Sequence, residues 1–536
     1  MRKTIGFLAA LACSVAFGPA LAQEGETLLV ALPSDISSTD SAFSGDSSTE
    51  AVARQAMEGL VRLKPGSLNE VEPVLAEALP TVSDDGLVYT FKIRKGVKFH
   101  DGEPLDADAV KFNYDRWLKM PDTLTGYSYG KIGSLQQSVD KVVVDDPTTV
   151  SIHLKKRNSG FLISQVLPAF AIASPAALRE GKADNSVTDR ANIPYAQGSD
   201  KALVGTGPFV FQDWKRGSEV ELVKNEEYWN AKEQGNVGTL VFRIMTDPTA
   251  TLNALQSGSV DVAQILSPQN IKLAKDDDTL QVLPRNGCSM AQIYFNQKFP
   301  PFDAVKVRQA VGTSIDRQLL VDKLFDGNAA AADGFLPKGF PFAVTGNIPT
   351  YNAAGAKELV SALKPEQRTL EFWYPSNVSR PYMPDPQALF DSARRDLEAA
   401  GFTVVPKTTT WSDYLTKVFA GEVPMSVLGN VCNWPSPDNF FGMLYFGFPA
   451  GSSVMPEMGY GDDELKQMLQ SATSSATKDE EAKVWAAFQN RLGQDLPFMP
   501  LLSPDFPAVA STAVKGFVTS PFLGVAETYS TVTVER

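Results

Sequence analysis

The sequence has few of the residues on which metal sites and many enzymes depend. Its 536 residues contain two histidines, His100 and His153, and three cysteines. Two histidines exclude a H-E-x-x-H zinc site and any multi-histidine metal cluster. There is also no C-x-x-C pair, no G-x-x-x-x-G-K-[ST] phosphate loop and no G-x-S-x-G nucleophile turn. We therefore predict no catalytic residue, no metal and no cofactor.

Positive charge and long apolar runs are also scarce. The chain has 49 Lys and Arg against 62 Asp and Glu, a formal net charge of -13. This balance argues against nucleic acid and against docking on anionic lipid. No stretch after residue 22 approaches about 18 consecutive apolar residues, so we expect no membrane insertion. The length predicts two or three lobes, because one hydrophobic core seldom serves so long a chain.

The first 22 residues have the pattern of a secretory signal peptide. Arg2 and Lys3 precede an apolar segment, and Ala20-Leu21-Ala22 forms an A-x-A cleavage site. We therefore expect export to the periplasm. Cleavage would leave Cys288 and Cys432, which in an oxidising compartment suggest one disulfide, with two separately buried thiols as the alternative.

The most informative stretch runs from residue 88 to residue 117. The apolar residues of two expected strands alternate with polar ones: Tyr89, Phe91 and Ile93, then Val97 and Phe99. A helix capped by Asp106 follows. Further along, a helix capped by Asp303, a strand at 370–374, a helix opened by Asp385-Pro386 and a strand at 425–428 predict a sheet covered by helices.

The order of residues in 88–117 closely resembles the signature of the family 5 extracellular solute-binding proteins, the peptide- and nickel-type receptors of ABC importers. GTGPF at 205–209, Tyr228-Trp229 and VRQAVGTSIDRQLLV at 307–321 resemble further family landmarks. The resemblance implies an α/β fold of the periplasmic-binding-protein type II kind, in which a hinge joins two large lobes and one carries a smaller inserted lobe. It also implies a monomer that delivers a ligand to a membrane permease, and it favours the disulfide.

By this resemblance, residues 1–22 form the signal peptide and the rest divides into three lobes. The expected ranges are 23–60, 198–286 and 507–536 for lobe I, 61–197 for lobe II and 287–506 for lobe III.

The segment VSRPYMP at 378–384 resembles the part of the dipeptide receptors whose arginine holds the ligand carboxylate. Arg380 occupies that position. A planar guanidinium can pair both oxygens of a carboxylate, and a closed cleft strengthens the bond by excluding water. The alternative is a surface arginine before a proline turn.

The segment LGNVCNWPSPDNFF at 428–441 resembles the receptors' second binding loop. At the position of the aspartate that holds the ligand amine, this chain has Asn433, which brings no charge to a buried ammonium. Asn430 replaces the family's usual tryptophan. Trp411 and Trp434 offer area for stacking on a ligand, with simple burial as the alternative. The loop has no histidine, which argues against nickel.

We therefore predict a periplasmic receptor that binds a short peptide or a peptide-like anionic solute through Arg380. Because Asn433 is neutral, N-blocked or secondary-amine ligands should bind better than simple dipeptides. One alternative is a receptor of the same fold for oligosaccharides or other non-peptide solutes. The other is a secreted hydrolase, which the placing of the two histidines disfavours.

Overall fold

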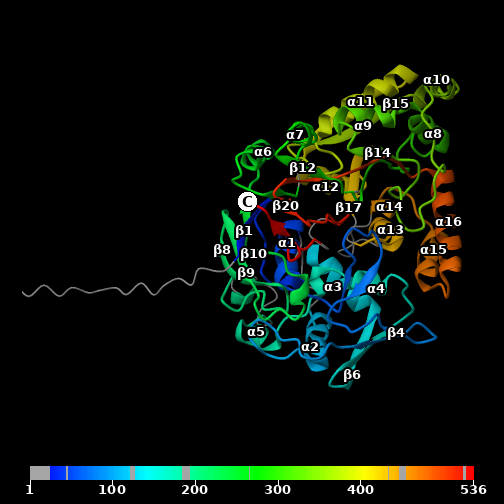
Figure 1. Ribbon diagram of the computed structural model, residues 1–536. Coiled ribbons are helices and arrows are strands. Elements are labelled where there is room, and N and C mark those ends of the chain that lie inside the picture. The colour runs from blue at the N-terminus through cyan, green and yellow to red at the C-terminus, as the bar shows by residue number, and fades with distance from the viewer. Residues whose placement is uncertain are drawn as a thin grey trace, which may run out of the picture.

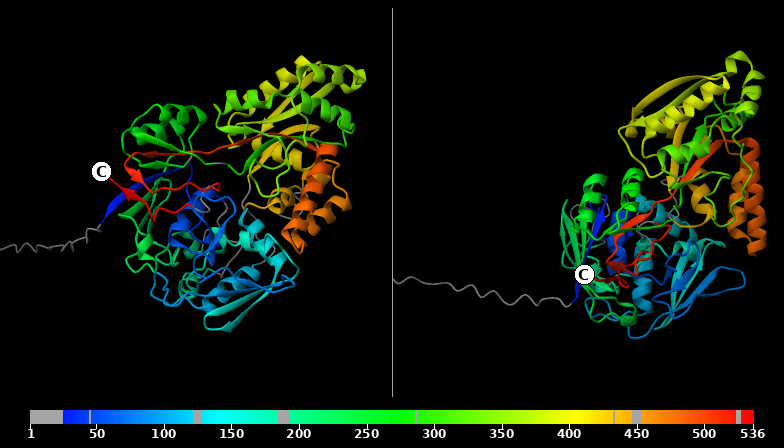
Figure 2. Two further views of the ribbon diagram at one scale, coloured as in Figure 1. Left: turned by 45° about the vertical axis from the view of Figure 1, so that its right-hand side comes forward. Right: turned by 45° about the horizontal axis from the view of Figure 1, so that its top comes forward.

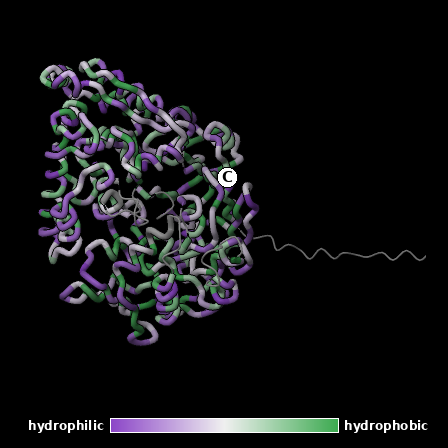
Figure 3. Tube along the Cα trace, turned by 180° about the vertical axis from the view of Figure 1, so that it is seen from behind, coloured by the Kyte–Doolittle hydropathy of each residue, from purple (hydrophilic) through white to green (hydrophobic). Residues whose placement is uncertain are grey.

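A computed structural model of the chain shows three parts, each built around its own sheet (Figure 1). It describes residues 25–43, 46–120, 127–183, 193–264, 266–285, 287–431, 434–445, 454–522 and 527–536. In that portion of the chain, none of the helices is both long and apolar enough to cross a bilayer. Hydrophilic residues follow the outer turns of the molecule (Figure 3).

The first part is a seven-stranded sheet in the order β12-β19-β11-β1-β10-β9-β8. Its strands are β1 (Glu26–Leu32), β8 (Phe209–Lys215), β9 (Glu219–Lys224), β10 (Val237–Ile244), β11 (Val262–Ala263), β12 (Leu280–Leu283) and β19 (Ala508–Ser511). Three distant stretches of sequence therefore share one sheet. Helices α6 (Pro248–Gln256) and α7 (Pro268–Lys275) bury apolar side chains against it.

The second part is smaller and carries the signature stretch. Its sheet has the order β4-β5-β7-β6. The strands are β4 (Thr81–Val82), β5 (Val88–Lys92), β6 (Val139–Asp146) and β7 (Thr149–Leu154). Asp106 caps α2 (Ala107–Leu118), as predicted, because its carboxylate accepts a hydrogen bond from the Ala109 N–H at 2.8 Å. The predicted second strand was wrong: Val97 and Phe99 are buried, but only an isolated bridge forms there, from Lys98 to Pro104.

The third part is a six-stranded sheet in the order β14-β18-β13-β17-β15-β16. Its strands are β13 (Ser289–Phe295), β14 (Ala329–Ala331), β15 (Thr369–Ser376), β16 (Thr403–Thr410), β17 (Met425–Val431) and β18 (Phe498–Pro504). Strand β15 runs parallel to both β16 and β17. Helices α11 (Pro386–Ala400) and α12 (Trp411–Phe419) make the crossovers that parallel strands require.

Helix ends in this part follow local sequence at some positions and not at others. Asp385 caps α11 with a hydrogen bond from the Ala388 N–H at 2.9 Å, and Gly401 ends the helix with a left-handed φ of 110°. The predicted cap at Asp303 was wrong. Helix α8 (Val305–Ser314) begins after Ala304, which makes no side-chain capping bond.

The third part is joined to the rest by two stretches of chain that run side by side, before β13 and after β18. Arg285 ties them together: its carbonyl accepts from the Phe506 N–H at 3.0 Å, and its guanidinium donates to the Phe506 carbonyl at 3.0 Å. The same guanidinium forms a fully buried ion pair with Glu527. Figure 2 shows the third part set against the other two. The end residues predicted for each lobe stay predictions.

The GTGPF and Tyr-Trp landmarks meet around one buried carboxylate. Glu58 accepts hydrogen bonds from Thr206 Oγ1 at 2.8 Å, Tyr228 OH at 2.8 Å and Trp229 Nε1 at 2.9 Å. Burial raises the pKa of Glu58, and the three donors act in the opposite direction. Gly207 lies so close to α1 (Ser47–Ala56) that a Cβ there would come within 2.6 Å of the Ala56 carbonyl carbon. The landmarks therefore pack together around the end of α1.

Candidate functional site

The candidate site lies at the edge of the third sheet where β15 and β17 both end. Because the two strands are parallel neighbours, the segments that follow them emerge on the same side of the sheet. Ligands of open α/β sheets bind outside such carboxyl ends. The segment after β15 carries Arg380, and the end of β17 carries Asn430. The sheet thus brings together residues that are fifty positions apart.

Arg380 is held in a tight turn, and its side chain makes no ion pair with the described carboxylates. Its N–H donates to the Met383 carbonyl at 3.1 Å, and its carbonyl accepts from the Met383 N–H at 2.8 Å. The guanidinium lies over the ring of Trp411, with Cζ 4.7 Å from the ring centroid. Its Nε is buried without a hydrogen-bond partner. None of the described carboxylates pairs with this side chain, so its charge is available to an anionic ligand.

Trp411 is the first residue of α12, and this helix fixes its position. Its ring stacks on that of Tyr414 at 6.1 Å, and Tyr414 is itself fully buried and donates to the Val427 carbonyl at 2.6 Å. That carbonyl is free to accept because β15 pairs with β17 only through Met425 and Ser426. Trp411 therefore lies beside Arg380, which covers one face of its ring, and its role in binding stays a prediction.

Tyr382 is a site residue that the sequence reading missed. Its ring lies against Gly429 of β17, where any larger residue would collide with it. Burial raises the pKa of Tyr382 to about 12, although the nearby Arg380 acts to lower it. The ring thus fixes the Arg380 segment onto β17. The only sequence signal was a glycine inside a strand, which often marks a close approach of other groups.

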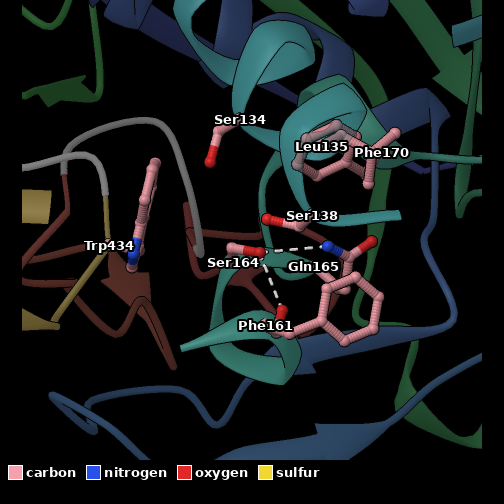
Figure 4. A pocket seen from close by; sticks show the side chains of 8 residues that line it. All are labelled: Ser134, Leu135, Ser138, Phe161, Ser164, Gln165, Phe170 and Trp434. Carbon is pink, nitrogen blue, oxygen red and sulfur yellow. Dashed lines mark hydrogen bonds between the residues drawn. The ribbon is translucent and has the colours of Figure 1, made fainter. Parts of the chain in front are cut away.

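Asn430 and Trp434 are both buried, with 8% and 7% of their surface exposed. Neither the side-chain oxygen nor the nitrogen of Asn430 has a hydrogen-bond partner, and Trp434 Nε1 has none either. Trp434 closes a small pocket whose other wall is the second part of the molecule. Figure 4 shows its ring facing Ser134, Ser138 and Ser164.

Asn433 and Cys432 lie outside the described residues. The amide predicted at the amine-binding position therefore stays a prediction. Cys288 is buried with 3% of its surface exposed, and its pairing with Cys432 also stays a prediction.

Three hydrogen bonds cross between the second and third parts near this pocket. The Ser159 N–H donates to the Thr473 carbonyl at 2.8 Å, Ser159 Oγ donates to Glu481 Oε1 at 2.8 Å, and Arg157 donates to the Ala476 carbonyl at 2.9 Å. Glu481 is buried in α16 (Lys478–Asp495). These bonds hold the second part against the third.

The two histidines lie in the second part, away from Arg380. His100 is half-buried, and its Nε2 lies 2.9 Å from the Gly207 carbonyl. Burial lowers its pKa. His153 pairs with Val88 and Lys141 across the strands of the sheet. Within the described ranges, no three His, Cys, Asp or Glu side chains are grouped so as to hold a metal ion.

The fold and the site together define a lobed binding protein whose third sheet carries, at its carboxyl edge, a guanidinium that pairs with none of the described carboxylates. The sequence profile of the bacterial extracellular solute-binding proteins, family 5, matches residues 70–452. Heme-binding protein A of Haemophilus influenzae is 31% identical over 496 residues, covering 89% of this chain and 86% of that protein. Di/tripeptide-binding protein 1 of Pseudomonas aeruginosa is 26% identical over 491 residues, covering 88% of each.

The solved structure of HbpA2 from Haemophilus parasuis superposes with a TM-score of 0.81 at 26% identity, over 95% of this chain and all of that one. The chain belongs to the bacterial extracellular solute-binding proteins, family 5. This family consists of solute-binding proteins. The predicted family, α/β fold and substrate-binding role are therefore confirmed.

Proposed function

We propose that this protein binds a short peptide or a peptide-like anionic solute between its lobes and delivers it to an ABC permease. The observation that supports the proposal is the guanidinium of Arg380, which lies half-buried over Trp411 at the carboxyl edge of the third sheet and pairs with none of the described carboxylates. A half-buried cation without an anion costs free energy, which a bound carboxylate recovers. The match to a di/tripeptide-binding protein is consistent with this ligand class.

Recognition and closure act together in this mechanism. Arg380 holds both oxygens of the carboxylate through its fork of N–H donors. Closure brings Ser159 against Glu481 and removes water from the site. The ligand shifts the lobes toward the closed form because its affinity for that form is higher. The ligand is released intact to the permease.

Several further features belong to the same proposal. Cleavage after Ala22 would release the mature protein as a monomer into the periplasm, where Cys288 and Cys432 would form a disulfide. Because Asn433 carries no charge, we expect N-blocked or secondary-amine ligands to bind more tightly than simple dipeptides.

The test is a thermal-shift and calorimetric screen of dipeptides, tripeptides, N-acetylated peptides, opines and sugars. For the tightest ligand, Arg380→Ala should weaken binding at least thirtyfold, and amidation of the ligand carboxylate should have a similar effect on the wild type. These factors correspond to the loss of about 2 kcal/mol or more when one partner of a buried charged pair is removed.

The matched control is Arg394→Ala, which removes an exposed arginine of the same lobe that pairs with Glu398 at 2.8 Å. It should leave affinity unchanged. Equal affinity of wild type and Arg380→Ala for every ligand would overturn the carboxylate anchor. A sugar as the tightest ligand would favour the oligosaccharide alternative.

A further inference from the structure

The Asn430 side chain has unmet hydrogen-bonding capacity inside the protein. It lies near the carboxyl end of β17, more than nine-tenths buried, and both its Oδ1 and its Nδ2 are without a partner. Buried amide groups in folded proteins are nearly always paired, because leaving one unpaired is costly. Two other buried atoms of the candidate site, Arg380 Nε and Trp434 Nε1, also have no hydrogen-bond partner. An unpaired buried amide at the carboxyl end of β17 therefore indicates a place where a ligand group binds.

A second unpaired amide lies on the same face of the sheet. In the antiparallel pair β13–β17, Asn430 is opposite Met290 and Leu428 is opposite Gln292. Residues two positions apart on a strand point to the same face, so Gln292 is the diagonal neighbour of Asn430, about 7 to 8 Å away. Gln292 is fully buried. Its Oε1 accepts from Tyr294 OH at 2.6 Å, while its Nε2 has no partner.

The bond from Tyr294 fixes the orientation of the Gln292 amide. With Oε1 occupied, the Nε2 N–H groups remain unpaired on the face of the sheet that also carries Asn430. Asn430 adds further donors and one acceptor. Both side chains are neutral, so a charged group buried between them would be uncompensated, and an apolar group would leave them unpaired. A neutral group that both donates and accepts hydrogen bonds satisfies this arrangement.

We propose that Asn430 and Gln292 form a neutral subsite that binds an amide group of the solute. Nε2 of Gln292 donates to the amide carbonyl, and Oδ1 of Asn430 accepts from the amide N–H; with a primary amide, Nδ2 of Asn430 can also donate to the carbonyl. This inference rests on the proposed function, because it adds a second contact point to a solute anchored at Arg380. It makes the preferred cargo a carboxylate that also carries an amide. A site built around such bonds discriminates strongly against analogues that lack them.

Two matched ligand pairs separate the two sources of an amide. Ala-Gln and Ala-Met differ in a side-chain amide at similar length. Ala-Ala and its ester analogue, in which oxygen replaces the peptide N–H, differ in the backbone amide. Wild type should bind the amide member of at least one pair ten times or more tightly by calorimetry. The variant Asn430→Leu, of similar size, should reduce that preference to about twofold or less, and Gln292→Met should reduce it in part.

A measurement without ligand makes the test independent of the cargo. If the Asn430 side chain serves ligand binding and not the stability of the fold, Asn430→Leu removes an unpaired buried polar group. It should then raise the melting temperature of the ligand-free protein. A lower melting temperature would show that the amide supports the fold, and would overturn the proposal. Unchanged discrimination in Asn430→Leu, or none in the wild type, would also overturn it. Loss of binding in Arg380→Ala tests the carboxylate anchor separately, so the two proposals can fail independently.

Discussion

The buried carboxylate of Glu58 gives the sharpest test of how this fold is held together. Substitution by alanine leaves three buried donors, on Thr206, Tyr228 and Trp229, without their acceptor. Each unpaired donor costs about 1 to 3 kcal/mol, and entering water recovers part of that sum. We therefore expect Glu58→Ala to lower the free energy of unfolding by about 3 to 6 kcal/mol, measured by urea denaturation.

Glu58→Gln is the matched variant. Its oxygen can accept from Thr206 and Trp229, while its nitrogen donates to the Tyr228 hydroxyl oxygen, so we expect a change within about 1 kcal/mol at pH 7. The pH dependence follows from the raised pKa of Glu58. A carboxyl with a raised folded pKa costs stability as pH rises above its unfolded value, and glutamine cannot ionise.

The stability of Glu58→Gln relative to wild type should therefore increase as pH rises through this range. Equal destabilisation by the glutamine and alanine variants would refute the reasoning, because it would show that the negative charge of Glu58, and not its role as an acceptor, stabilises this cluster.

Two further predictions concern closure and pH. Ser159→Ala removes the hydroxyl bond to Glu481 and should weaken ligand binding about five- to tenfold, mainly through faster dissociation in stopped-flow measurements. The control Ser83→Ala loses a similar bond within one lobe, and a matching effect there would contradict the role in closure. Because the pKa of His100 is lowered, the unfolded chain takes up a proton below about pH 6.5 that the folded state does not, and stability falls. His100→Gln can still donate to the Gly207 carbonyl, so it should reduce this loss of stability between pH 7.5 and 5.5, measured by urea denaturation. If the free energy of unfolding falls equally with pH in the variant and the wild type, another group is responsible.

Local sequence was sufficient where neighbouring residues provide the physical cause. Asp106 and Asp385 cap their helices as expected, since a cap depends on backbone groups within three residues. The second strand at Val97–Phe99 failed because a strand needs a partner along its length, and here the chain turns back at once, leaving a single isolated bridge from Lys98 to Pro104. The alternation of apolar and polar residues correctly predicted that Val97 and Phe99 are buried, but it did not predict strand pairing.

In the candidate site, too, sequence predicted the residues but not their contacts. The resemblance supplied Arg380, Trp411, Asn430 and Trp434 as candidates, but it gave no position for their side chains. Tyr382 was not predicted, because its role depends on the contact with Gly429 across the sheet.

The sequence by itself determined the family, the alternation of helices and strands, and the absence of the residues that a zinc site or a nucleotide loop requires. Only the tertiary structure showed that Arg380 pairs with none of the described carboxylates, and that the Asn430 amide and Nε2 of Gln292 lack partners. The reason is physical. Whether a polar group is paired depends on strands and lobes that are distant in sequence, and pairing, more than residue type, decides what a buried group can bind.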